Sequence, residues 1–198
     1  RFICDVVKPD GTPFEGDSRY ILKRAISQAK EMGFELDVAI KSEFFLFDLD
    51  ENGEPTNHTT EKGGYFDIGP TDGGENTRRD MVLYLADMGI EVESSYHSDE
   101  AAQHVLDLSH VDALSMADDI MTTRLVVRTV ARRHGCHGTF MPKPKENVKG
   151  SGAHYTFSVC KDGKNILSDS SDELGVSKEG YQFMTGILRH IASMTLVN

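Results

Sequence analysis

Apolar and polar positions alternate with two different periods along the chain, and the two periods predict different elements. Period-two alternation between turn residues predicts strands at Phe2–Val7, Leu36–Leu49, Ile90–His97, Gln103–Leu108, Gly138–Pro142 and Ala153–Cys160. Helical spacing predicts helices at about 17–32, 75–88, 110–134 and 177–195. Strands and helices are interleaved without a regular repeat of βαβ units. We therefore expect an α+β fold, with a mostly antiparallel sheet and helices packed on one face.

Local signals mark several ends of the predicted helices. Asp17 and Ser177 are expected N-caps because short polar side chains can accept hydrogen bonds from the first turn of a helix. Gly33, Gly89 and Gly135 stand where a helix commonly ends in a glycine.

The helix predicted at 110–134 carries an apolar stripe that we expect to be buried. The stripe consists of Leu114, Ala117, Ile120, Met121, Leu125 and Val126. By contrast, Arg78 and Arg79 are expected at a helix surface or an interface, because charged side chains are rarely fully buried.

Composition narrows the possible functions. The chain has 198 residues and a formal net charge of -11, which suits one globular domain and disfavours a general electrostatic grip on nucleic acid. No apolar run approaches membrane-spanning length, so we expect no membrane partner. Cys4, Cys136 and Cys160 form no metal-ligand spacing, which favours reduced cysteines and a cytoplasmic protein. Walker and Rossmann glycine loops are also missing from the sequence.

Several ordered strings resemble one enzyme family. They are Asp10-Gly-Thr-Pro-Phe-Glu-Gly-Asp17, Glu43-Phe-Phe-Leu-Phe47, Gly64-Tyr-Phe-Asp67, Gly74-Glu-Asn-Thr-Arg-Arg-Asp80, Phe140-Met-Pro-Lys-Pro-Lys145 and Gly150-Ser-Gly-Ala-His154. In this order they resemble type I glutamine synthetases, the ATP-dependent ligases that join ammonia to glutamate. The resemblance covers nearly the whole chain. It implies that residues 1–198 form a single segment of the catalytic domain, without the family's β-grasp domain and C-terminal half.

The resemblance also implies ligands and site residues. Glutamate, ammonia and ATP are the family's substrates, Mg²⁺ or Mn²⁺ serves the phosphoryl transfer, and the subunits assemble into oligomers, so a homo-oligomer is expected. Glu43 and His154 occupy metal-ligand positions of the family. Glu93 and Ser158 occupy nucleotide positions, and Gly150 occupies a glutamate position.

Three further ligand positions of the family carry other residues here. Lys41, Ser98 and Val105 stand where family members have glutamates. An ammonium group repels a metal cation, but Lys41 lies two residues from Glu43 on the same strand face, so we expect it within reach of Glu43 as a tethered replacement cation that keeps the carboxylate ionised. One carboxylate with one imidazole rarely holds Mg²⁺ against its hydration shell. Metal and ATP binding is therefore expected to be weak or lost, and no catalytic residue is assigned. Asp99 or Glu100 can replace a missing metal ligand only if the loop that carries them adopts a conformation different from that of the family.

These substitutions leave three functional hypotheses open. The first is a catalytic-domain segment that does not turn over, in effect a pseudoenzyme. The second is a working ligase of altered specificity. The third is a regulatory or assembly module that keeps the fold in order to pair with active subunits. Both chain ends look cut rather than evolved, and the segment from Ser177 to Val197 is expected to exchange between copies. The sequence leaves open whether the substitutions are natural or engineered.

Overall fold

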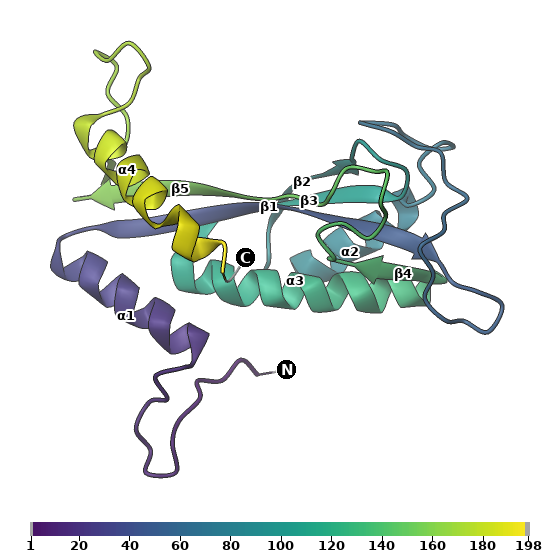
Figure 1. Ribbon diagram of the computed structural model, residues 1–198, viewed down its shortest axis with the longest axis horizontal. Helices are drawn as coiled ribbons and strands as arrows, with labels where there is room; N and C mark the ends of the chain where they lie inside the picture. The colour runs from purple at the N-terminus through teal and green to yellow at the C-terminus, as the bar shows by residue number, and fades with distance from the viewer. Residues whose placement is uncertain (1, 197–198) are drawn as a thin grey trace. The chain divides into compact units, whose positions relative to one another are not determined.

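The computed structural model describes residues 2–196, which contain four helices and six strands (Figure 1). The helices are α1 (Ser18–Glu31), α2 (Glu75–Asp87), α3 (Ala113–Arg133) and α4 (Lys178–Met194). The strands are β1 (Glu35–Asp48), β2 (Val92–His97), β3 (Gln103–Asp112), β4 (Cys136–Thr139), β5 (Ala153–Lys161) and β6 (Lys164–Asn165). In the part of the chain described, no helix is both long and apolar enough to cross a bilayer.

The chain divides into two compact units. Val38–Thr156 forms most of the first unit, and Cys4–Asp37 forms the second together with the segment from Phe157 onward. The strand order is β2-β3-β1-β5-β6, with β4 paired to β1 beside this path. Both β1 and β5 contain residues of each unit, so the unit boundaries fall inside strands.

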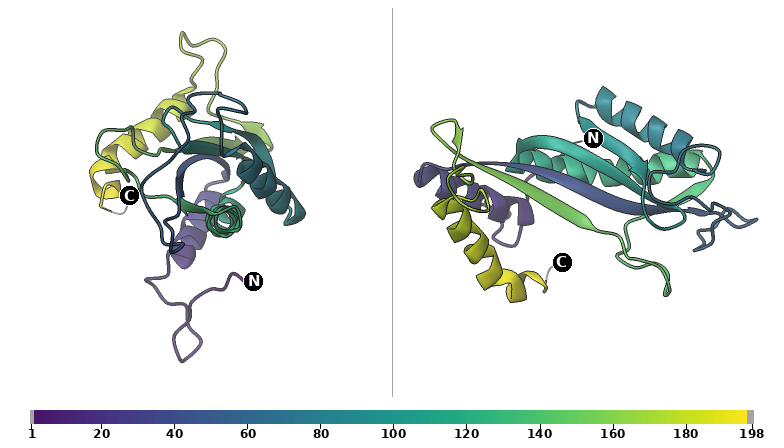
Figure 2. Two further views of the ribbon diagram at one scale, coloured as in Figure 1. Left: turned by 90° about the vertical axis from the view of Figure 1, so that its right-hand side faces the viewer. Right: turned by 90° about the horizontal axis from the view of Figure 1, so that it is seen from above.

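The first unit is an antiparallel sheet with helices on one side. β2 pairs with β3, placing Tyr96 opposite Val105, and β4 pairs with the end of β1, placing Thr139 opposite Phe45. Helices α2 and α3 lie on the same side of these strands (Figures 1 and 2). The expectation of an α+β fold with a mostly antiparallel sheet is confirmed.

Strand β1 is buried on both of its faces. Phe44 and Leu46 enter the main core together with residues of α2, α3 and β3. Phe45 and Phe47 alternate with them and form a second cluster with Ala102. Since side chains alternate along a strand, Glu43 shares the face of Phe45 and Phe47. The candidate site therefore lies on the sheet face opposite the main core.

Two strand predictions need correction. Phe2–Val7 is not a strand, because its only bridge joins Val7 to Pro13 within the same arm, and Phe2 is exposed. Apolar alternation alone cannot form a strand without a partner. The strand predicted at Gly138–Pro142 is instead β4, Cys136–Thr139, and it ends before the proline.

The buried stripe of α3 also differs from the prediction. Met121 and Leu125 are exposed. The buried residues of this helix are Met116, Thr123, Val126, Val127, Val130 and Ala131. The helical period was correct but its phase was wrong, because Thr123 is fully buried and a polar residue was not expected on the inner face.

In the second unit, α1 and α4 begin at the expected caps. Asp17 accepts a hydrogen bond from the backbone N–H of Arg19, and Ser177 accepts one from Gly180. Phe157 of β5 packs edge-on against Phe183 of α4, with ring centroids 5.7 Å apart. This contact joins the middle of β5 to α4.

Candidate functional site

Glu43 of β1 is surrounded by hydrogen-bond donors. Its Oε1 accepts from Ser98 Oγ at 3.0 Å, and its Oε2 accepts from the backbone N–H of Gly152 at 2.6 Å and from Gln103 Nε2 at 3.3 Å. Gln103 Nε2 also donates to the carbonyl oxygen of Gly150 at 3.1 Å. The carboxylate thus joins β1, the turn between β2 and β3, and the loop before β5.

His154 reaches the same point from β5. A Cβ atom added to Gly152 would lie 2.5 Å from His154 Nε2 and 3.3 Å from Glu43 Oε2. Both side chains therefore pack against the backbone of Gly152, which explains why a glycine is needed there. Gly150 is constrained as well, because a Cβ atom would lie 2.6 Å from the carbonyl oxygen of Pro142.

Lys41 does not neutralise Glu43 in the way its place on the strand suggested. Its Nζ lies 5.3 Å from the centroid of the Tyr96 ring. A hydrogen bond with Tyr96 raises the pKa of Lys41, burial opposes the rise, and the charges of Tyr96, Asp107 and Tyr65 add to it. The ammonium group is held at Tyr96, the residue directly opposite Val105 in the sheet.

The two other substituted positions are buried. Ser98 is 5% exposed, and its hydroxyl is committed to Glu43. Val105 is 0% exposed on β3. Neither side chain can ligate a hard cation through a carboxylate, so their contribution to the site is a neutral hydrogen bond and apolar packing.

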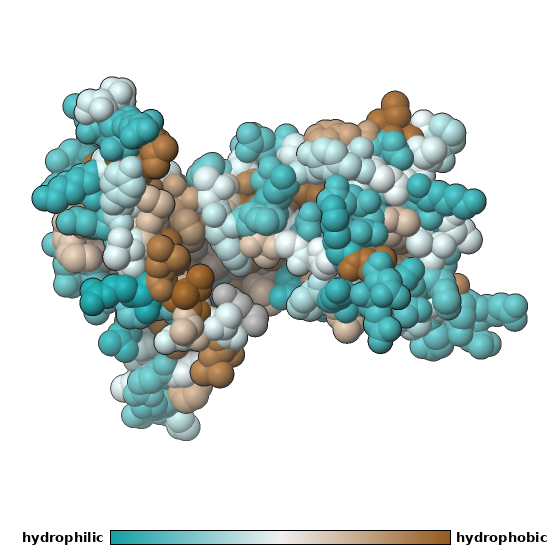
Figure 3. All heavy atoms as spheres, turned by 45° about the horizontal axis from the view of Figure 1, so that its top comes forward, coloured by the Kyte–Doolittle hydropathy of each residue, from teal (hydrophilic) through white to brown (hydrophobic). Residues whose placement is uncertain are grey.

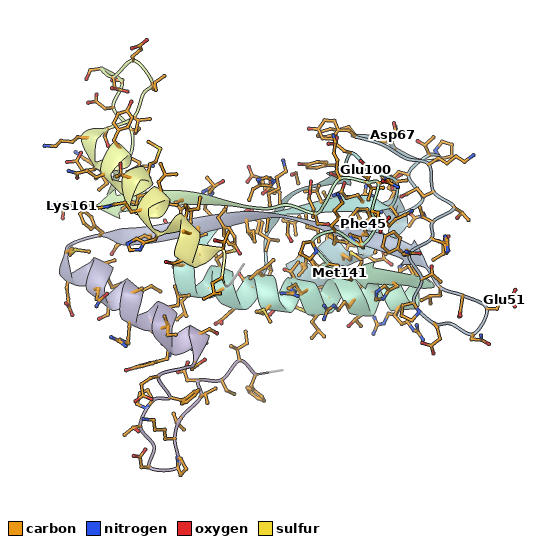
Figure 4. All side chains as sticks on the ribbon, viewed as in Figure 1. Phe45, Glu51, Asp67, Glu100, Met141 and Lys161 are labelled. Atoms are coloured by element: carbon orange, nitrogen blue, oxygen red, sulfur yellow. The ribbon has the colours of Figure 1, made fainter. Side chains whose placement is uncertain are left out.

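Asp99 and Glu100, the potential substitute ligands, are engaged elsewhere. Lys149 Nζ forms an ion pair with Asp99 Oδ2 at 2.7 Å, and the Lys149 backbone N–H donates to Glu100 Oε1 at 3.0 Å. Figure 4 shows Glu100 on the turn at the same end of the first unit as Phe45. The hydrogen bond with Asp99 raises the pKa of Lys149. The loop therefore directs its acids toward Lys149.

A buried polar network behind the site was missed from the sequence. Arg78 is buried and makes two hydrogen bonds to Asp72, at 2.9 and 2.6 Å. The interpretation of Arg78 as a surface or interface residue is therefore wrong, although Arg79 is exposed. Helical spacing contained the signal, because Arg78 stands three and seven residues before the buried Met81 and Leu85.

The same network contains two histidines and a glutamate. His97 Nε2 lies 3.1 Å from Glu61 Oε2, and His97 Nδ1 lies 2.8 Å from the carbonyl oxygen of Ser98. Burial opposes the charging of His97, but its bonds to Glu61 and Ser98 raise its pKa. Burial raises the pKa of Glu61. The hydrogen bond from His97 and the neighbouring charges outweigh this effect and hold the pKa below its usual value. Both ring nitrogens of His97 thus face oxygen acceptors, and the Glu61 carboxylate favours the protonated form of the ring.

Glu61, Asp72, His97 and His104 place ligand-type atoms within 4.8 Å of one another, close enough to consider a metal site. Arg78 argues against it. Its guanidinium occupies Asp72 and lies 2.9 Å from His104 Nδ1, and a guanidinium can only donate. Nδ1 is therefore the acceptor, and the proton of neutral His104 sits on Nε2, where a ligand needs a lone pair. Burial lowers the pKa of His104 to about 3, so the ring stays neutral near pH 7. The cluster fits an ion-pair network better than a metal.

Comparison with known proteins identifies the family. The family described as glutamine synthetase, catalytic domain, matches residues 15–198. The chain belongs to the glutamine synthetase family. Glutamine synthetase of Clostridium saccharobutylicum is 53% identical over 197 residues, which cover 100% of this chain and 44% of that protein. The enzyme of Staphylococcus aureus (strain MW2) is 48% identical over 198 residues, with the same coverage.

Solved structures of glutamine synthetases share the fold. The cryo-EM structure of Plasmodium falciparum glutamine synthetase matches with a TM-score of 0.84 and 28% identity, covering 95% of this chain and 43% of that one. The chain therefore spans less than half the length of these relatives.

In this member of the glutamine synthetase family, the structure brings together three of the five expected site residues. Glu43, His154 and Gly150 meet around the loop before β5. Glu93 is exposed on β2, whereas Ser158 belongs to the second unit and accepts a hydrogen bond from Asn165 Nδ2 at 3.3 Å. The two expected nucleotide residues thus lie in different compact units.

Proposed function

We propose that residues 1–198 are a segment of a glutamine synthetase catalytic domain that does not form glutamine by itself. Family membership supports glutamate, ammonia and ATP as the ligands, with Mg²⁺ or Mn²⁺ as the ion that would neutralise phosphate oxygens. The residues at the family's metal-ligand positions do not fit a divalent cation, because three of them are not carboxylates. The proposal rests on Lys41, Ser98 and Val105 together with the three donors around Glu43.

A working ligase of altered specificity has less support. It needs Asp99 or Glu100 as a replacement ligand, and both are bound to Lys149. Freeing either acid requires the loop to break its contacts. An assembly module remains the second candidate function, favoured by the apolar side chains that α4 exposes. We place the protein in the cytoplasm, consistent with three free cysteines.

The deciding experiment measures phosphate release with glutamate, ammonia, ATP and Mg²⁺. We expect no release above the rate of a heat-denatured sample, because phosphoryl transfer needs cations at the crowded phosphate oxygens. The chain is short relative to its relatives, so a second arm is needed. The full-length Clostridium saccharobutylicum enzyme should receive Lys, Ser and Val at the three corresponding positions.

That variant is expected to lose phosphate release while the parent enzyme keeps it. A matched control replaces three exposed surface residues of the same enzyme with Lys, Ser and Val. Turnover by this chain at the parent enzyme's rate would refute the proposal. Turnover by the triple variant would show that the substitutions are not what prevents catalysis.

A further inference from the structure

Divalent cations are the family's means of stabilising charge at this site, and the donors around Glu43 decide whether one can bind here. A hard cation needs carboxylate lone pairs that point toward it. In this chain Glu43 Oε1 receives the Ser98 hydroxyl, and Oε2 receives the Gly152 N–H and the Gln103 amide. Each donor hydrogen carries partial positive charge into the region where a cation would approach the carboxylate.

The donors are also difficult to displace. The Gly152 N–H belongs to the backbone, so it leaves Glu43 only if the loop before β5 moves. In addition, Gln103 Nε2 is anchored to the carbonyl oxygen of Gly150, which holds the same loop from its other side. Ser98 is nearly fully buried, so its hydroxyl would be left without a hydrogen-bond partner if it moved away from Glu43, and this would destabilise the fold.

We propose that Glu43 acts as a hydrogen-bonding clasp, which ties β1 to the β2–β3 turn and to the loop before β5, and that it does not hold a divalent cation. The three bonds bridge residues 55, 60 and 109 positions apart in sequence. Hydrogen bonds to a charged group contribute more than neutral ones. The clasp thus takes over the joining role that a shared metal ion would have.

This inference rests on the proposed function only in treating Glu43 as a ligand position of the family. The contacts themselves do not depend on catalysis. Consequently, a stability measurement tests the clasp and phosphate release tests the proposed function, and either can fail while the other stands.

The first test compares thermal unfolding of Ser98→Ala with that of Ser94→Ala, a serine of the preceding strand β2 that lies outside the clasp. Ser98→Ala is expected to lower Tm by about 2–8 °C, since a lost bond to a charged group in a chain of this length shifts Tm by a few degrees per kcal/mol. Ser94→Ala is expected to leave Tm within about 1 °C. Equal Tm values for the two variants would overturn the clasp.

The second test uses MnCl₂ as the probe, with bound Mn²⁺ measured by electron paramagnetic resonance and Tm measured with and without EDTA. The parent chain is expected to show no saturable Mn²⁺ site and no EDTA-dependent change in Tm. The variant carrying Lys41→Glu, Ser98→Glu and Val105→Glu is expected to bind Mn²⁺ at least tenfold more tightly. Equal affinity in parent and variant would overturn the proposal, and the Ser98→Ala comparison remains decisive if the variant does not fold.

Discussion

His104 couples stability to pH through its burial. The pKa of the folded-state imidazole is about 3, whereas an unfolded histidine titrates near 6.5. The unfolded chain therefore binds a proton that the folded chain excludes, and the free energy of unfolding falls as pH drops from about 6.5 toward 3. His97 acts with the opposite sign. Its raised pKa contributes stability that is complete below about 6.5 and is lost as pH rises through the folded value.

We expect these two residues to give a stability maximum near pH 6.5, with a loss on the order of a few kcal/mol on the acid side. Urea unfolding midpoints measured from pH 4 to 9 check this. The variant His104→Gln should flatten the acid slope, while His58→Gln, at an exposed histidine, should not. An unchanged acid slope in His104→Gln would show that other groups dominate.

Residue-level prediction from the sequence was uneven for a physical reason. Glu43 could be placed from its string and its strand period, but the donors that satisfy it come from residues 55 or more positions away. Lys41 was expected beside Glu43, but its ammonium group lies over the ring of Tyr96. An ammonium group is attracted both to carboxylates and to aromatic rings, and the sequence alone does not determine which of the two is nearer. Side-chain partners of this kind depend on the register between strands.

Among the elements, helix ends were predicted well because their signals are local. The caps at Asp17 and Ser177 are confirmed, and Gly33, Gly89 and Gly135 have the positive φ of a helix C-terminus. The prediction of a strand at Phe2–Val7 was wrong because strand formation depends on a pairing partner elsewhere in the chain. The buried face of α3 was predicted wrongly because the packing of α2 and the sheet against this helix decides which of its faces is buried.

Helix α3 has a cap that the sequence did not single out. Asp112 Oδ1 accepts from the backbone N–H groups of Leu114 and Ser115, both at 3.1 Å. We expect Asp112→Ala to reduce the free energy of unfolding by about 1 kcal/mol, as for other lost caps. Asp112→Asn keeps an acceptor and should cost less than half as much. Urea denaturation of the two variants provides the comparison, and equal losses would mean that the cap is not the cause.

At the scale of the whole molecule, α4 carries an apolar surface. Its exposed face contains Tyr181, Met184, Leu188 and Ile191, spaced by three or four residues, and Leu188 is 66% exposed. Figure 3 shows hydrophobic atoms gathered along one flank of the part of the molecule that carries α4. The expected exchange segment from Ser177 to Val197 includes this helix, although Val197 lies outside the described residues.

We therefore expect concentration-dependent self-association through α4, driven by removal of these side chains from water. Leu188→Glu should weaken it at least tenfold in Kd, because association would bury an unpaired charge. Gln182→Glu, an exposed change on the same helix, serves as the control. Sedimentation velocity at several concentrations provides the measurement. A strict monomer at the highest concentration would contradict the expectation.

The division of the chain into units implies an order of folding during synthesis. The first unit is almost one continuous stretch, Val38–Thr156, whereas the second joins Cys4–Asp37 to residues that follow Phe157. Within the second unit, Lys161 Nζ lies 5.7 Å from the ring of Phe34, a contact that spans more than a hundred residues. Such long-range closure is slow and must wait for its later partner. During synthesis, the segment Cys4–Asp37 thus remains without these partners until the residues that follow Phe157 have been added.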